Sequence, residues 1–299
     1  MANQLPAPKD RSRGCLFCAN VDGRFDSEEH VVPLTTGNTP SSGLVENALV
    51  IAPGTICDKC NGRRLSLRDQ AFANWPPVSA FRTLAQVRNR RGRLQDAVAG
   101  TEWDLRFHPT DPNEFCLKLS ADTGPDSGRE EVMRALCKIA LETRFLEDPA
   151  DARSSRWDAV AAAAIGGPIP PNLAMGLKLP SNYAALDLAI ESDVEVNPRA
   201  SSLQMVLRLY VVGLGFILLL DTPPPRVPDT GWWVPDANGN LTGPASVEAS
   251  FYGRADSVKR GPGLEQPSSK HSSRLASADP ALTMFLQPSG GSENDEPQT

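Results

Sequence analysis

Two Cys-x-x-Cys pairs lie near the start of the chain, separated by 38 residues. The first pair is Cys15 and Cys18, and the second is Cys57 and Cys60. Two such pairs supply the four thiolates that satisfy a tetrahedral Zn²⁺ ion and leave no coordination position open. A redox Cys-x-x-Cys usually comes singly, ahead of a helix in a βαβ unit, and that context is absent around the first pair. The sequence therefore predicts a structural zinc site.

An acidic residue and a histidine, Glu29 and His30, lie between the two cysteine pairs. The other two histidines, His108 and His271, fall in an expected loop and in the C-terminal tail. A lone histidine is more often a surface residue of a strand, but this one lies between two zinc-binding pairs. A neutral imidazole can take a proton from water that attacks a phosphodiester, and a divalent cation with oxygen ligands can neutralise the developing charge. We therefore expect His30 to be the imidazole that the protein uses.

The net charge of −6 is unevenly distributed, because residues 1–93 carry +5 and the remainder carries −11. No acidic residue occurs between positions 70 and 95, so pairs within one helix cannot neutralise the arginines there. A solvated helix face is the simpler alternative, but an unpaired basic strip beside His30 favours contacts with a nucleic-acid backbone, without sequence readout. The arginines assigned to this strip are Arg63, Arg64, Arg68, Arg82, Arg88, Arg90, Arg91 and Arg93.

Hydrophobic periodicity predicts the elements that must position these groups. We expect helices over 65–74, 78–87, 130–147 and 157–165, and strands over 103–107, 115–119, 183–190, 203–210 and 211–220. The longest apolar run, residues 209–220, has 12 residues, fewer than the ~20 that a membrane-spanning helix needs. Cys116 and Cys137 are expected in the core, and Trp232 and Trp233 at the edge of a sheet.

Three motifs occur in order: the first cysteine pair, Glu28-Glu29-His30-Val-Val-Pro33, and the second cysteine pair with Asn61 directly after it. Together they resemble an HNH endonuclease of the zinc-knuckle type over about residues 14–75. Residues 134–140 more loosely resemble a helix in accessory regions of such proteins.

The resemblance implies a ββα-metal fold and hydrolysis of DNA phosphodiester bonds, with His30 as the general base. It implies Glu29 and Asn61 as ligands of a catalytic cation, with Asp69 as a further carboxylate. Asn47 is the best match to the middle asparagine, which positions the histidine through backbone hydrogen bonds, and Asn38 is the second. Leu65 stands where some members carry another metal-binding histidine, so the ligands are rich in oxygen and favour Mg²⁺ or Mn²⁺.

We thus expect an α+β protein with four parts: a flexible arm (1–13), a zinc-stapled HNH nuclease domain (14–93), a separate α+β accessory domain (94–253) and a disordered tail (254–299). Its cysteines and the absence of an apolar leader indicate the cytoplasm. The expected function is metal-dependent cleavage of DNA, as in bacterial defence or restriction-type effectors. Two alternatives stay open: a catalytically silent zinc-knuckle protein that binds nucleic acid or regulates, and an RNA-directed nuclease. We expect no membrane partner, and a homo-oligomer or a ligand sensed by residues 94–253 also stays open.

Overall fold

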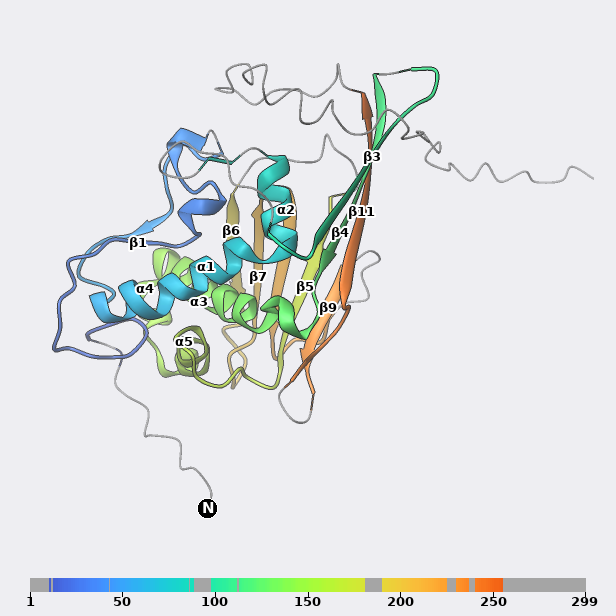
Figure 1. Ribbon diagram of the computed structural model, residues 1–299. Coiled ribbons are helices and arrows are strands. Elements are labelled where there is room, and N and C mark those ends of the chain that lie inside the picture. The colour runs from blue at the N-terminus through green and yellow to red at the C-terminus, as the bar shows by residue number, and fades with distance from the viewer. Residues whose placement is uncertain are drawn as a thin grey trace, which may run out of the picture.

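The structure is a computed structural model of the chain. It describes residues 11, 13–42, 44–85, 87–88, 98–111, 113–180, 190–224, 230–236 and 240–254. The described chain is mixed α+β, with helices packed against a large antiparallel sheet and a second, narrower sheet at its side (Figure 1). Nearly all of the expected arm and tail, and of the expected strand over 183–190, lies outside the described residues.

The N-terminal region is a short antiparallel ribbon followed by helices. Strand β1 (Glu29–His30) pairs with β2 (Val50–Ile51), and the 3₁₀ turns η1 (Leu34–Thr36) and η2 (Pro40–Ser42) lie in the loop between them. The π-helix η3 (Cys60–Leu65) continues directly into α1 (Ser66–Asn74), and α2 (Pro76–Leu84) follows. Trp75, between α1 and α2, has an extended backbone, and Pro76 is the first residue of α2. At that position the amide hydrogen that proline lacks would have no partner within the helix, so no hydrogen bond is lost. The two predicted helices are therefore present, with a shorter second one.

The large sheet has six strands in the order β10-β9-β5-β8-β7-β6. Its strands are β5 (Leu173–Lys178), β6 (Glu191–Val196), β7 (Met205–Val211), β8 (Leu214–Leu220), β9 (Thr230–Pro235) and β10 (Leu241–Thr242). In β7 the residues Met205, Leu207, Leu209 and Val211 are buried and alternate with less buried ones, the period of two that one covered face produces. Two residues with positive φ, Val212 and Gly213, connect β7 to β8, where the sequence predicted adjoining strands.

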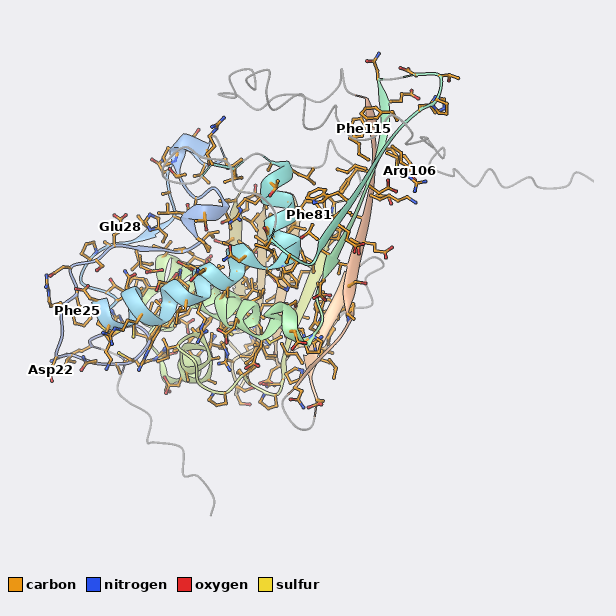
Figure 2. The ribbon with its side chains drawn as sticks, viewed as in Figure 1. Asp22, Phe25, Glu28, Phe81, Arg106 and Phe115 are labelled. Carbon is orange, nitrogen blue, oxygen red and sulfur yellow. The ribbon has the colours of Figure 1, made fainter. Side chains whose placement is uncertain are left out.

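The narrower sheet has the order β11-β4-β3 and comprises β3 (Thr101–Phe107), β4 (Glu114–Asp122) and β11 (Ser246–Arg254). The 3₁₀ turn η4 (Pro125–Ser127) follows β4. Figure 2 shows Phe81 of α2 facing this sheet, where its ring meets that of Phe251 edge-on with centroids 5.7 Å apart. Cys116 of β4 and Cys137 are buried, as predicted.

One long helix, α3 (Arg129–Glu147), contacts three of the other helices and, in the large sheet, β6 and β8. It packs against α1 and against α4 (Pro149–Ala152) and α5 (Asp158–Ala164), which η5 (Ser155–Trp157) links. Nearly every side chain from Arg129 to Thr143 is buried, because neighbours surround the helix. The predicted helices over 130–147 and 157–165 are therefore confirmed. No helix within the described ranges is long and apolar enough to cross a membrane.

The buried core is continuous across position 94, where the sequence placed a domain boundary. Phe72 and Trp75 of the N-terminal helices pack on Phe216 of β8, with ring centroids 5.2 Å and 6.1 Å apart. Trp75 also meets Trp233 of β9 edge-on at 5.9 Å. The packing thus joins residues on both sides of position 94 in one core.

Candidate functional site

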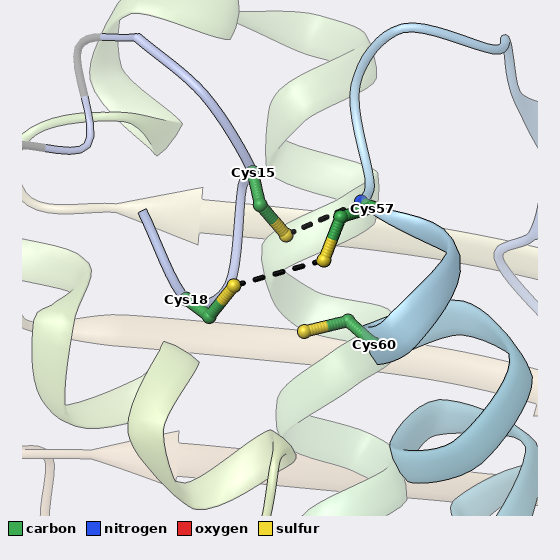
Figure 3. A group of neighbouring side chains, drawn as sticks. All are labelled: Cys15, Cys18, Cys57 and Cys60. Carbon is green, nitrogen blue, oxygen red and sulfur yellow. Dashed lines mark hydrogen bonds between the residues drawn. The ribbon is translucent and has the colours of Figure 1, made fainter. Parts of the chain in front are cut away.

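The four cysteines of the two pairs converge on one point (Figure 3). Their sulfur atoms all lie within 4.8 Å of one another, and the Sγ atoms of Cys18 and Cys57 are 3.7 Å apart. In a tetrahedral site with Zn–S bonds of ~2.3 Å, neighbouring sulfurs lie ~3.8 Å apart. None of the four forms a disulfide. The cluster therefore fits a zinc ion held by four thiolates, as the spacing predicted.

Local backbone geometry shapes the first cysteine turn. The amide of Ala19 donates to the carbonyl of Cys15 (3.0 Å), and the amide of Cys57 donates to the Cys15 sulfur (3.4 Å). Gly14 has φ +84°, and a Cβ there would lie 2.6 Å from the carbonyl oxygen of Asn20. Only glycine fits this position, because both the backbone angle and the space exclude a side chain.

Two arginines fix this turn to the helical part of the chain. Arg11 is 5% exposed, donates to the carbonyl of Ala152 (2.8 Å) and pairs with Asp158 (2.9 Å). Arg153 donates to the carbonyl of Gly14 (2.9 Å). The cysteine cluster is therefore anchored to α4 and α5 as well as to its own loops.

Asn38 closes the loop between β1 and β2. Its Nδ2 donates to the carbonyls of Val32 (2.8 Å) and Leu49 (3.0 Å), and its Oδ1 accepts from the amide of Leu49 (2.8 Å). Asn47, the preferred candidate from the sequence, is exposed. The structure thus favours Asn38, the second match from the sequence, because its buried side chain spans both ends of the loop.

The second cysteine turn leads straight into the π-helix that carries Asn61. The Asn61 amide donates to the carbonyl of Cys57 (3.0 Å), and its side-chain Nδ2 donates to the carbonyl of Glu28 (3.0 Å). A π-helical turn widens the helix locally and is common at functional sites. Here it ties Asn61 to the strand that bears His30.

The side chains of the two glutamates before His30, Glu28 and Glu29, point to opposite sides of the extended chain. Side chains of an extended chain point to opposite sides in turn, so Glu29 faces the interior and is 4% exposed. The Glu28 and His30 side chains are 53% and 19% exposed, with Oε1 of Glu28 3.8 Å from Nε2 of His30. Glu28, which the sequence left without a role, is thus the carboxylate beside the imidazole.

A cleft of about 460 Å³ collects five of the residues singled out from the sequence. Its walls come from the strand around His30, from the loop after it, from the π-helix and α1, and from α2. They comprise Glu28, Glu29, His30, Pro33, Leu34, Thr35, Asn61, Ser66, Asp69, Gln70, Ala73, Asn74 and Arg82. The cleft therefore brings His30, Glu29, Asn61, Asp69 and Arg82 together.

A lysine that the sequence left without a role binds two of the expected metal ligands. Lys138 of α3 is fully buried, and its Nζ lies 2.6 Å from Glu29 Oε1 and 2.7 Å from Asp69 Oδ1. It also donates to the carbonyl of His30 (2.7 Å) and lies 3.7 Å from Glu142. The ammonium group therefore occupies the place of a cation between Glu29 and Asp69 and holds the backbone of His30.

Burial and mutual charge set the ionisation of this cluster. Burial alone would lower the pKa of Lys138, but the charges of Asp69, Glu142 and Glu29 outweigh it and raise the pKa. Burial raises the pKa of Glu29 and Asp69, and the lysine charge opposes that rise. Burial raises the pKa of Glu142 well above its usual value. The lysine thus stays charged, and Glu142 retains its proton most readily.

The carboxylates as arranged do not fit a divalent cation. Lys138 already binds an oxygen of both Glu29 and Asp69, and burial leaves Glu29 little access to the cleft. Among the described residues, the four cysteines form the one group of three or more His, Cys, Asp or Glu side chains placed to hold a metal ion. The fold thus supports a zinc site and gives no second metal site from these acidic groups.

The arginines of the expected basic strip have different environments. Arg63 and Arg88 are exposed and Arg64 is half-buried. Arg68 pairs with Glu131 and donates to the carbonyl of Ala164, so its charge is used within the protein. Arg82 is buried in the wall of the cleft. Arg90, Arg91 and Arg93 lie outside the described residues.

Comparison of the chain with protein-family models, with curated proteins and with solved structures finds no match.

Proposed function

We propose that this protein is a nuclease that hydrolyses DNA phosphodiester bonds in the cleft beside the cysteine cluster, in the manner of the HNH enzymes that its motifs resemble. The observation that carries the proposal is the convergence of His30, Asn61 and Arg82 on one cleft from three separate segments. Asn61 follows Cys60 directly and donates to the carbonyl of Glu28, so a bound zinc ion would hold the helix that is hydrogen-bonded to the segment of His30.

His30 would act as the general base. Water attacks phosphorus, its proton passes to the imidazole, and the bond from phosphorus to the 3′ oxygen breaks. Glu28, 3.8 Å from Nε2, would stabilise the imidazolium that forms, as a carboxylate does for a catalytic histidine. The departing 3′ oxygen takes a proton from solvent. A catalytic Mg²⁺ or Mn²⁺ forms no part of this proposal, because Lys138 binds two of its three expected ligands.

The test is nicking of supercoiled plasmid by the wild-type protein, by His30→Ala and by His108→Ala. His108 is a matched control, because it is a half-buried histidine in the turn after β3 that does not line the cleft. We expect His108→Ala to cleave like wild type and His30→Ala to lose about 10²–10⁴-fold in rate, the usual contribution of a general base. Parallel assays with EDTA, Mg²⁺ and Mn²⁺ measure any cation requirement, and RNA of the same sequence tests the alternative substrate.

Equal rates for wild type and His30→Ala, including no cleavage by either, would remove the support for catalysis. The second candidate would then stand: a zinc-knuckle protein that binds nucleic acid without cleaving it. The salt bridges from Lys138 to Glu29 and Asp69 favour it, since they occupy the expected metal ligands. Retained binding of labelled DNA by His30→Ala, with no cleavage by wild type, would establish it.

A further inference from the structure

Arg82 differs from the other buried cations of the described chain in having no acceptor. It is 3% exposed, its Nε contacts no hydrogen-bond acceptor, and no carboxylate of the described residues pairs with it. The four other buried cations all reach carboxylates or carbonyls. Arg11 pairs with Asp158, and Arg134 pairs with Glu130. Arg129 donates to backbone carbonyls, and Lys138 binds the carboxylates described above.

A buried charge without a partner is unfavourable for the folded protein. Burial accordingly lowers the pKa of Arg82, with no acidic neighbour acting against it. A buried charge that lowers stability and makes no internal hydrogen bond or ion pair is typical of a group whose partner is a ligand. Arg82 lines the cleft, so an anion in the cleft can approach its side chain.

The α1 wall of the cleft carries three uncharged polar side chains beside Asp69, whose carboxylate is paired with Lys138. Ser66, Gln70 and Asn74 recur every four residues on α1, which places them on one face of the helix, and all three line the cleft. From the first to the third this row extends ~12 Å, at a rise of 1.5 Å per residue. Such side chains can hydrogen-bond to sugar and base groups without repelling a phosphate.

We infer that Arg82 binds a phosphate group of a single strand of nucleic acid, which lies in the cleft along α1 next to the phosphodiester bond at His30. The cleft volume of about 460 Å³ is that of a site for a small organic ligand, which corresponds to a nucleotide unit. A single strand fits this volume better than a duplex, whose major groove alone is ~12 Å wide, so in supercoiled plasmid the substrate would be a locally opened strand. Planar guanidinium groups bind phosphate through two parallel hydrogen bonds. The position of the reacting bond rests on the proposed function, whereas the phosphate site at Arg82 does not.

Binding is measured by fluorescence anisotropy, with a labelled deoxythymidine hexanucleotide and with a labelled duplex, in the full-length His30→Ala protein so that no cleavage interferes. The variants add Arg82→Gln or, as a control with the same change of charge, Arg199→Gln. Arg199 is exposed in the turn between β6 and β7 and does not line the cleft.

We expect Arg82→Gln to weaken binding of the single strand by about 10–100-fold, the equivalent of one charged hydrogen-bonding group. The slope of log affinity against log salt should fall by ~0.7, the value for one phosphate contact on a single strand. The affinity of Arg199→Gln should stay within about 2-fold of its parent, the size of a surface effect.

Thermal melting separates a binding role from a structural one. Without the oligonucleotide, Arg82→Gln should melt at the same temperature as its parent or higher, and the oligonucleotide should raise the melting temperature of the parent only.

The inference is overturned if Arg82→Gln binds the single strand as tightly as Arg199→Gln. A lower melting temperature of Arg82→Gln would indicate a structural role and also overturns it. Tighter binding of the duplex than of the single strand, with the same loss of affinity for both in Arg82→Gln, overturns it too. If the single strand binds through Arg82 but wild type cleaves nothing, the proposed function fails and this inference stands.

Discussion

Replacing Lys138 by methionine removes the central charge of the site with little change in side-chain volume. In the wild-type protein the ammonium group touches Glu29 at 2.6 Å, Asp69 at 2.7 Å and the carbonyl of His30 at 2.7 Å. The variant leaves these groups without their cation. Glu29, whose side chain is 5% exposed, cannot turn to water, whereas Asp69 is 24% exposed and remains partly solvated.

The expected loss follows from these exposures. Breaking a buried ion pair by removing one partner costs about 3–5 kcal/mol, because the other charge stays buried without compensation. Most of that loss should come from Glu29, since Asp69 keeps some water. Against a total stability of about 5–15 kcal/mol, the variant should remain folded but be markedly weakened.

Urea unfolding followed by circular dichroism measures the loss, with the zinc content checked in parallel. Glu29→Gln introduced into the Lys138→Met protein removes the stranded charge, so the double variant should be more stable than Lys138→Met alone. A loss below about 1 kcal/mol for Lys138→Met would refute the reasoning, as the typical exposed ion pair gives no more. Failure of Glu29→Gln to restore stability would refute it too.

Three further predictions concern the surroundings of the cleft. Asn38→Ala should lower the free energy of unfolding by about 2–4 kcal/mol, since three buried hydrogen bonds are lost, whereas exposed Asn47→Ala should change it by less than about 0.5 kcal/mol in the same urea titration. The folded chain keeps the Glu142 proton above the ordinary pKa of 4.5, so unfolding releases that proton and the contribution of Glu142 to stability is lost as the pH rises from that value. The advantage of Glu142→Gln over wild type should therefore grow with pH, and a difference that is constant with pH would contradict the assignment. Cys60→Ala should lose the zinc ion measured by metal analysis and unfold the ribbon, while Cys116→Ala, buried away from the cluster, should keep the metal.

Local sequence patterns predicted the parts of the structure that depend on neighbours in the chain. The cysteine cluster follows from the spacing within each pair and from the chemistry of zinc. The helix from Arg129 to Glu147 and the hairpin of β7 and β8 follow from apolar periodicity over many residues. In these elements burial and backbone geometry repeat regularly, so the apolar pattern indicates a helix or a strand without knowledge of the fold.

The contacts that decide the chemistry of the cleft are distant in sequence. Lys138 shares its helix face with Arg134 and Glu142, one turn away on either side, and neither neighbour indicates that its ammonium group meets Glu29 from the first strand. Asn38 and Asn47 occupy the same loop, and only the folded loop shows which side chain spans it. The role of Glu28 was within reach of sequence reasoning, because alternation places positions 28 and 30 on the same side. The strand there is only two residues long, so its pattern carried little weight.

The aromatic rings against which the N-terminal helices pack belong to β9 and β11, which come late in the chain. Their late synthesis limits the order in which a newly made chain can fold. Both cysteine pairs have been synthesised once the chain reaches residue 60, so the four thiolates can bind zinc early in synthesis. Trp75 and Phe81 must wait for Trp233 and Phe251, which the ribosome adds roughly 10–30 s later at 5–20 residues per second. Over that interval α1 and α2 lack their final support, so the walls of the cleft are completed only when nearly the whole core has left the ribosome.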